Sequence, residues 1–373
     1  MSGLLQTLAQ LTPAAPQQLS RDYDGVEYRW KAFAFRPAAF RFEAYMLAVL
    51  GGYVLLHLLG KAYNTGRAKK LYEPYTALIK SQFTLVRPAT PSSSALHLLY
   101  ATGRRNVLAL HATLTLLPYH DVITLVYEFV WSIIEPTADI SEGFTFGLTL
   151  GRGNAGLQGE GLGVWALVNK NSLKKVKEAR YDLSFPRLFE SAAVPVTHTV
   201  FAEHSDVNDV IFKTPNVGVA EVLADPVAAD VLKYLIITDQ PSERPVRGAL
   251  KTEYRAREIS LAVYKPTNAD QEAAVNAWLQ VALNLADLEG KPGLLKAEVA
   301  RKIAKTRVEV DASLNSKYKK EQEEDNPPEV TPEDKRLAKK RAERAQLSEK
   351  ELKKVEELER KREMRKMQKR QMK

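Results

Sequence analysis

The residues most suggestive of chemistry are the glycines of GRGNAG, Gly151 to Gly156, which have the G-x-G-x-x-G spacing of a dinucleotide-binding loop. Such a loop needs a strand before it and a helix after it, because N–H groups at the helix N-terminus hold the pyrophosphate. A strand-like run, FTFGLTL, does precede the glycines. The residues that follow, LQGEGLGVWALVN, contain three more glycines and then a second strand-like run, so their helix propensity is low. We therefore interpret residues 151–163 as a glycine-rich hairpin or loop that joins two strands.

The other chemically active residue types form no catalytic arrangement. HSDVND supplies metal-type ligands in His204, Asp206 and Asp209, but no further ligand cluster accompanies them and the pattern suits an ordinary polar loop. The chain has no cysteine, which excludes disulfides, thiolate metal sites and a thiol nucleophile, and it has no G-x-S-x-G motif. The sequence predicts a protein that is not an enzyme and that needs no metal or cofactor.

Cations gather at the end of the chain. The net charge is +9, and residues 289–373 carry 26 Lys and Arg against 18 Asp and Glu, a net of +8. A basic run gains free energy on a polyanionic surface, because each neutralised phosphate releases counterions. The candidate nucleic-acid-binding residues are the eight cations of the final fourteen residues: Arg360, Lys361, Arg362, Arg365, Lys366, Lys369, Arg370 and Lys373. Anionic lipid is the alternative partner of the same tail.

The tail that carries these cations has the pattern of charged helices. Pro292 can begin a helix, Asn326-Pro327-Pro328 interrupts it, and Thr331 can cap a second helix. The apolar seam of Leu352, Val355 and Leu358 is too short for a stable coiled-coil dimer. The tail is therefore expected to be a solitary helix with a strongly basic end.

A membrane span is predicted at AYMLAVLGGYVLLHLLG, residues 44–60, seventeen residues without a formal charge. At 1.5 Å per residue the helix covers about 25 Å, close to the roughly 27 Å core of an endoplasmic reticulum bilayer. A buried core helix is the alternative. His57 is either a polar contact to another membrane helix or an interfacial group. Four cations in the twenty residues before the span and five in the twenty after it favour a cytosolic C-terminus.

The body after the span mixes helix and strand patterns without the strict alternation of a doubly wound sheet, which favours an α+β domain with antiparallel pairing. Pro88 and Pro91 indicate a linker in SQFTLVRPATPSSS. DVITLVYEFVWSII predicts an amphipathic helix, and Ala274, Trp278, Val281 and Leu285 form the apolar stripe of a long one. The expected organisation is a short luminal segment (1–43), a transmembrane helix (44–60), a juxtamembrane helix and linker (61–95), a cytosolic α+β domain (96–290) and a charged helical tail (291–373).

Five short stretches follow one another in the order GKAYNTGR after the span, SQFTLV, FTFGLTLGR, ARYDLSF and the closing KKVEELERKREMRKMQKRQMK. Together they resemble the family of calumin, also called coiled-coil domain-containing protein 47. The resemblance runs from about residue 44 to the end of the chain. It implies a single-pass endoplasmic reticulum protein with a luminal N-terminus, and a subunit of the PAT intramembrane chaperone complex for multipass membrane proteins. The implied partners are the ribosome through its RNA at the exit site, the Sec61 translocon, an Asterix-like small membrane subunit and the lipid bilayer.

The chain departs from that family in two places. The acidic, calcium-binding luminal region is absent, since the first 43 residues contain only Asp22, Asp24, Glu27 and Glu43 as acidic residues, so calcium binding is not carried over. The glycine-rich segment at 151–163 is longer than in the family and receives no role from the resemblance.

Overall fold

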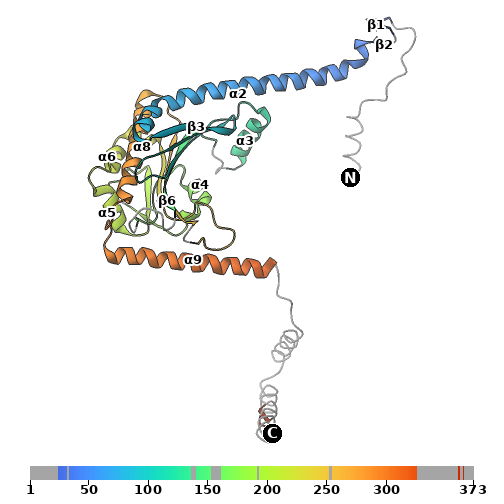
Figure 1. The fold of residues 1–373 in the computed structure, drawn as a ribbon. Helices are drawn as coiled ribbons and strands as arrows, with labels where there is room; N and C mark the ends of the chain where they lie inside the picture. Colours follow the sequence, from blue (N-terminus) through green and yellow to red (C-terminus); the bar gives the residue numbers. More distant parts are fainter. Residues whose placement is uncertain are drawn as a thin grey trace.

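The computed structural model describes residues 24–31, 33–135, 140–152, 161–190, 193–251, 254–325, 360, 361 and 364. Its centre is a nine-stranded sheet in which every neighbouring pair is antiparallel (Figure 1). The strand order is β3-β4-β5-β6-β11-β10-β7-β9-β8. The strands are β3 (Leu85–Ser93), β4 (Leu96–Thr102), β5 (Ala109–Thr115), β6 (Gly143–Arg152), β7 (Trp165–Asn169), β8 (Arg187–Phe189), β9 (His198–Ala202), β10 (Leu232–Thr238) and β11 (Ala256–Tyr264). The mixed α+β class is confirmed.

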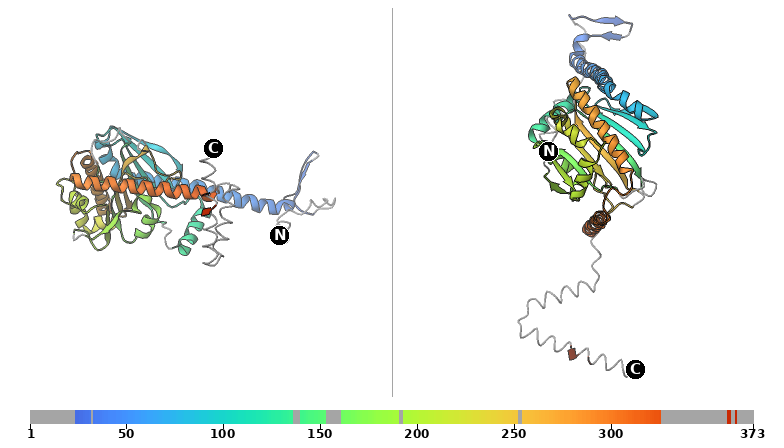
Figure 2. Two further views of the ribbon diagram at one scale, coloured as in Figure 1. Left: turned by 90° about the horizontal axis from the view of Figure 1, so that it is seen from below. Right: turned by 90° about the vertical axis from the view of Figure 1, so that its left-hand side faces the viewer.

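Helices cover one face of this sheet and form the main core. The central helix is α8 (Ala269–Glu289), which lies across the strands in the right-hand view of Figure 2. All four residues of its predicted apolar stripe are buried, and Trp278 Nε1 donates a hydrogen bond to the Ala228 carbonyl at 2.7 Å. The short helices α5 (Ser205–Lys213), α6 (Val219–Ala224) and α7 (Pro226–Val231) complete this layer.

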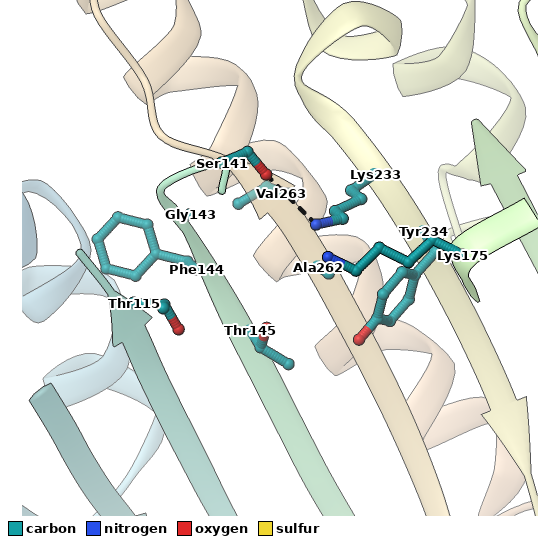
Figure 3. Close-up of a pocket in the computed structure, with 10 residues that line it drawn as sticks. All are labelled: Thr115, Ser141, Gly143, Phe144, Thr145, Lys175, Lys233, Tyr234, Ala262 and Val263. Atoms are coloured by element: carbon teal, nitrogen blue, oxygen red, sulfur yellow. Dashed lines mark hydrogen bonds between the residues drawn. The ribbon is translucent and has the colours of Figure 1, made fainter. Parts of the chain in front are cut away.

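The opposite face is covered in part. Helix α4 (Leu173–Ala179) and the 3-10 turn η3 (Tyr181–Leu183) pack a smaller cluster on β7, β9 and β10. Ser172 stands at the expected N-cap position of α4, but its hydroxyl donates to the Asn169 carbonyl at 3.2 Å and does not cap the helix. Beyond β10 on this face, the described residues leave two cavities beside α3 (Val122–Ile134), one of which is shown in Figure 3.

The long helix α2 (Arg41–Gln82) joins the predicted span to the body as one continuous element. Its second half packs on the sheet, where Tyr75 and Ile79 are completely buried. Its first half extends away from the body (Figure 1), and a small hairpin of β1 (Tyr28–Trp30) and β2 (Phe33–Phe35), followed by the turn η1 (Pro37–Phe40), precedes it.

The charged helix α9 (Ala297–Asp325) runs along the other side of the body and points the same way from it as the free part of α2 (Figures 1 and 2). The buried guanidinium of Arg307 holds it, with Nη1 3.0 Å from Glu203 and Nε 2.9 Å from Asp239. The helix begins later than Pro292 because Gly293, at φ 72°, takes a left-handed conformation. The predicted second tail helix lies almost wholly outside the described residues.

Two sequence expectations are corrected by the sheet. Residues 85–93, expected to be part of a linker, form β3, because an edge strand tolerates Pro88 and Pro91 where a central strand would lose ladder hydrogen bonds. The glycine-rich segment cannot be a hairpin, since β11 and β10 lie between β6 and β7 in the sheet. The segment does join two strands, because β6 ends at Arg152 and β7 begins at Trp165. Residues 153–160 between them lie outside the described residues.

Candidate membrane and partner interface

Helix α3 presents an apolar surface that the other described residues do not cover. None of its thirteen residues is buried, although ten of them are aliphatic or aromatic. Ile123 and Ile133 are each 70% exposed, and Trp131 is 44% exposed. Contiguous apolar surface of this kind marks contact with lipid or another protein. The sequence predicted this helix as amphipathic, and its exposed apolar side chains make it a candidate interface.

The first half of α2 is equally uncovered. It is the one helix among the described residues that is long and apolar enough to cross a membrane, and none of its apolar stretch is buried within the chain. A core helix of a soluble protein would be covered by its own fold, so this observation removes the alternative raised by the sequence. Its exposed apolar side chains are Met46, Leu47, Val49, Leu50, Val54, Leu55, Leu56, Leu58 and Leu59.

One face of α2 is polar or small, and it fixes the segment that leads into α3. Tyr53, His57, Gly60 and Asn64 recur at helical spacing and therefore share a face. The hydrogen bonds run from Tyr53 Oη to Asp121 Oδ1 at 3.2 Å, from His57 Nδ1 to the His120 carbonyl at 2.9 Å, and from Asn64 Nδ2 to the Leu117 carbonyl at 2.8 Å. His57 thus contacts its own chain, where the sequence left open a second membrane helix or the interface.

Gly60 permits this contact sterically. A Cβ atom at this position would lie 2.2 Å from the carbonyl oxygen of Tyr119, so any side chain here would push the segment away from α2. Beside it, the rings of Tyr63 and Tyr119 meet edge to face at 5.6 Å, and the Arg67 guanidinium lies 5.6 Å from the Tyr119 ring. The close approach of the Tyr119 backbone to α2 therefore requires a glycine at position 60.

A buried carboxylate ties the same segment to the sheet. Glu142, which directly precedes β6, accepts two hydrogen bonds from Arg67 at 2.8 and 2.6 Å and one from the Leu117 N–H at 3.1 Å, and it also pairs with Lys265. Burial alone would raise the pKa of Glu142, but the hydrogen bonds from Arg67 and Lys265 outweigh it and lower the pKa to about 2. The base of α3 is therefore joined to α2, β6 and β11 at one point.

The N-terminus of α3 is capped, and its direction crosses that of α2. The carboxylate of Asp121 accepts from the N–H groups of Ile123 and Thr124, each at 3.1 Å. Figure 1 and the left-hand view of Figure 2 show α3 beside the free half of α2 and turned across it. With α2 along a membrane normal, α3 would lie in the membrane plane at the level of Tyr53.

The candidate metal ligands do not assemble into a site within the part of the chain that the structure describes, and Gly153 to Gly156 of the nucleotide-like motif lie outside that part. The imidazole of His204 caps α5, accepting from the Asp206 N–H at 3.3 Å, and Asp209 pairs with Lys213 at 2.8 Å, so HSDVND starts a helix where a loop was expected. No group of three metal-ligating side chains occurs within the described residues. Gly151 belongs to β6, which pairs with β11, and the chain continues to β7.

Most of the predicted tail site lies outside the described residues. Arg360 and Lys361 are described, and both are helical and exposed. The remaining cations are Arg362, Arg365, Lys366, Lys369, Arg370 and Lys373, and the structure does not describe them. Their role stays a prediction.

Comparison with known proteins agrees with the membrane-exposed architecture. Residues 39–366 match the protein-family model described as PAT complex subunit CCDC47. The chain is also 30% identical over 304 residues to the UPF0674 endoplasmic reticulum membrane protein C2G5.01 of Schizosaccharomyces pombe, an alignment that covers 75% of this chain and 78% of the relative. The family description names a complex subunit and indicates no enzymatic activity. The matched range includes α2, the sheet and α9, so the expected resemblance is confirmed and the chain belongs to the CCDC47 family of PAT complex subunits.

Proposed function

We propose that this protein is a non-enzymatic, single-pass endoplasmic reticulum membrane protein that assists the biogenesis of multipass membrane proteins within an intramembrane chaperone complex. The observation that carries the proposal is the structure of α2, whose first half is apolar and uncovered and whose second half is packed into the folded body. One rigid helix thereby couples a membrane span to the sheet. The family membership supports the chaperone-complex role.

In this arrangement α3 lies in the leaflet nearest the body. Its base is fixed by Asn64, Asp121 and Glu142, so the helix is held at a defined height along α2. The exposed faces of α2 and α3 then form an apolar corner that can hold a small Asterix-like membrane subunit or the transmembrane segment of a client. Because lipid offers no hydrophobic driving force between helices, a preformed corner helps by positioning its partners.

Aromatic residues at the far end of α2 support a full crossing. Trp30 is 78% exposed, Tyr28 65% and Phe35 52%, and all three lie in the hairpin that precedes the helix. Aromatic side chains favour the membrane–water interface. We place this hairpin at the luminal interface and the sheet in the cytosol, which puts α3 in the cytosolic leaflet.

The natural absence of cysteine gives a direct test of this placement. Ile133→Cys on α3 and Lys174→Cys on α4 each create a single thiol at an exposed position. In sealed microsomes a water-soluble maleimide should label the α4 cysteine rapidly and the α3 cysteine only after detergent is added. The protein should remain in the pellet after carbonate extraction. Equal labelling of both thiols in intact membranes, or release by carbonate, would overturn the proposal.

The tail is proposed to reach the ribosome beside the Sec61 translocon. Helix α9 leaves the body anchored by Arg307 and leads into the segment whose last fourteen residues hold eight cations. Those cations would contact ribosomal RNA near the exit site, and log Kd should vary linearly with log salt, with a slope set by the number of phosphates neutralised.

Ribosome co-sedimentation from detergent extracts tests the tail. Deletion of residues 348–373, or reversal of the charges of 360–373, should abolish binding and its salt dependence. Reversal of three exposed cations of α9, namely Arg301, Lys302 and Lys305, is the matched control and should leave binding nearly unchanged. Unchanged binding after the deletion would exclude the tail. Retained binding to anionic liposomes without ribosome binding would favour the membrane-tether alternative.

A further inference from the structure

An apolar groove lies between the second half of α2 and the edge of the sheet. It has a volume of about 480 Å³ and is lined by one face of α2 and by the strands β3 and β4 beside it (Figure 1). Its apolar lining includes Ala68, Tyr72, Val86, Leu98 and Leu99. Val86 and Leu98 are only half-buried, although both belong to the sheet. The described residues therefore leave apolar side chains of the body available to a partner.

The helical side of the groove continues into the predicted membrane span. Thr65, Ala68 and Tyr72 form it, at spacings of three and four residues. The row continues toward the start of α2 at the same spacings through Lys61, Leu58, Val54, Leu50 and Leu47. Its four apolar members within the span are 49–67% exposed. One face of α2 thus runs from the membrane into the groove, and it differs from the face of Gly60 and Asn64 that contacts the segment before α3.

Two lysines give the groove a positive charge. Lys69 and Lys80 line it, whereas no Asp or Glu does so among the described residues. Both lysines are exposed, and neither pairs with a carboxylate in the part of the chain that the structure describes. Burial lowers the pKa of His97, which also lines the groove, so this side chain adds little charge at neutral pH. Glu73 lies between the two lysines on α2 but outside the lining, so the net charge stays positive.

The groove suits a helix better than an extended segment. β3 is an edge strand of the sheet, where a partner strand could add itself through main-chain hydrogen bonds. Pro88, which lines the groove, and Pro91 lack the N–H groups that such pairing uses. A helix satisfies its own main chain and packs through side chains, so the prolines do not hinder it.

Lys80 lies too far along α2 for a lipid headgroup. It follows Lys61, at the end of the span, by nineteen residues, or about 28 Å of helix. The headgroup layer of a bilayer is only about 5–8 Å deep on each side. With α2 along the membrane normal, the far end of the groove therefore fits the carboxylate of a protein.

We propose that this groove receives the cytosolic extension of a partner's membrane-spanning helix, which crosses the bilayer along the row from residue 47 to 58 and carries carboxylates opposite Lys69 and Lys80. The two lysines are eleven residues apart, about 16 Å along α2, so a helix that runs alongside should carry its carboxylates at a similar spacing. The inference rests on the proposed membrane crossing of α2, because only then does one partner helix follow both the span and the groove.

The test uses two synthetic peptides and the full chain, reconstituted together in phosphatidylcholine vesicles. Each peptide has a leucine-rich span followed by an amphipathic helix of about sixteen residues, the distance from Thr65 to Lys80. One peptide carries two glutamates eleven positions apart in this extension, and the other carries lysines there. Because the chain has no cysteine, Ser81→Cys provides a single exposed dye site at the end of the groove. Energy transfer from a dye on the peptide then measures association.

The glutamate peptide should associate at least about tenfold more tightly than the lysine peptide. Lys69→Glu with Lys80→Glu should reverse this preference. Lys70→Glu with Arg87→Glu makes the same charge change at exposed positions that do not line the groove, and should keep the natural preference. Equal association of both peptides with the natural chain, or the same response of both double variants, would overturn the proposal.

A steric pair tests the groove without changing its charge. Ala89→Trp introduces an indole at an exposed position that lines the groove, and should weaken association of the glutamate peptide about tenfold. Ala77→Trp places the same side chain on α2 outside the groove and should have no effect. Unchanged association in Ala89→Trp, with both variants melting at the natural temperature, would exclude the groove as the docking site.

Two further readouts separate the possible failures. Quenching of the dye at Ser81 by spin-labelled lipid headgroups would place Lys80 at the headgroup layer, assign the lysines to lipid and overturn the partner helix. Flotation of the vesicles after a carbonate wash separates this inference from the proposed function. A chain that stays in the vesicles and shows no preference between the peptides contradicts only the groove, whereas a chain that is washed off contradicts the membrane crossing itself.

Discussion

Helices α8 and α3 are both rich in apolar residues but have opposite surroundings. Eleven of the 21 residues of α8 are buried against the sheet and neighbouring helices, whereas none of the thirteen residues of α3 is buried. Hydrophobic composition alone therefore specifies that a helix avoids water but not what replaces the water. The difference lies in the anchors. Packed side chains position α8, whereas polar contacts at its base position α3 and leave its apolar side chains exposed among the described residues.

The sharpest way to break this comparison is the same substitution in both helices. Trp278→Ala in α8 removes a completely buried indole and its hydrogen bond to Ala228, and should lower the free energy of unfolding by about 3–5 kcal/mol. Trp131→Ala in α3 should change it by less than about 0.5 kcal/mol in detergent, because the detergent micelle covers that surface in both proteins. Thermal unfolding monitored by circular dichroism measures both.

The contrast fails if the two variants melt at the same temperature. A loss of several kcal/mol for Trp131→Ala would mean that α3 is packed against the chain in solution. Its surface would then be an internal contact that the structure does not show.

The charged helix α9 is held to the body in a third way, by a buried arginine that pairs with two carboxylates. Arg307 is 8% exposed and bridges Glu203 and Asp239, so Arg307→Met leaves two carboxylates without their partner and should cost about 3–5 kcal/mol. Arg301→Met, at an exposed position of the same helix, should cost little. Limited proteolysis should cleave within α9 in the first variant and not in the second. Equal protection of α9 in both would show that apolar contacts alone hold it.

The sequence predicted the elements better than their roles. The stripe of Trp278 and its neighbours gave the core helix, because periodic burial is a local pattern. Strand β3 was missed because Pro88 and Pro91 indicate a turn unless the strand lies at an edge, and edge position is a property of the whole sheet.

The interface itself could be predicted only in part. The apolar span was visible from composition, and a helix was expected over residues 121–134, one residue longer than α3, because Asp121 caps the helix. The contacts of His57, Gly60 and Asn64 with residues 53 to 63 positions later depend on tertiary structure, and no local pattern encodes them.

The end of α8 and the base of α3 each contain one buried carboxylate with a shifted pKa, and the two carboxylates give opposite dependences of stability on pH. Burial raises the pKa of Glu289, at the end of α8, to about 7, although Arg257 and the Leu162 N–H oppose the shift. The folded state binds the proton more tightly, so stability is fully present below pH 4.5 and falls, by roughly 2–3 kcal/mol, as the pH rises through 7. Glu142, with its pKa lowered to about 2, acts oppositely and contributes stability above pH 4.5 that is lost toward pH 2.

Substitution isolates the α8 contribution. Glu289→Gln should flatten the fall in melting temperature between pH 5 and 8 while leaving the acid limb near pH 3 intact. Glu178→Gln, at an exposed position of α4, is the control and should keep the wild-type profile. A fall of the same size in Glu289→Gln would assign the pH dependence to another group.

The smallest expected effect concerns the close approach that holds α3 beside α2. Gly60→Ala places a methyl group 2.2 Å from the Tyr119 carbonyl and should cost about 1–3 kcal/mol, because the segment from Leu117 to Asp121 must move as a unit. Gly52→Ala, two turns earlier on the same helix, meets no atom within 4 Å and should be neutral or slightly stabilising. The specific readout is the yield of a bis-maleimide cross-link between cysteines introduced at Tyr53 and Asp121, which should form in the natural background and in Gly52→Ala but fall in Gly60→Ala. Equal yields in all three would mean that α3 keeps its place without the contact at Gly60, and that the anchors around Glu142 suffice to orient it.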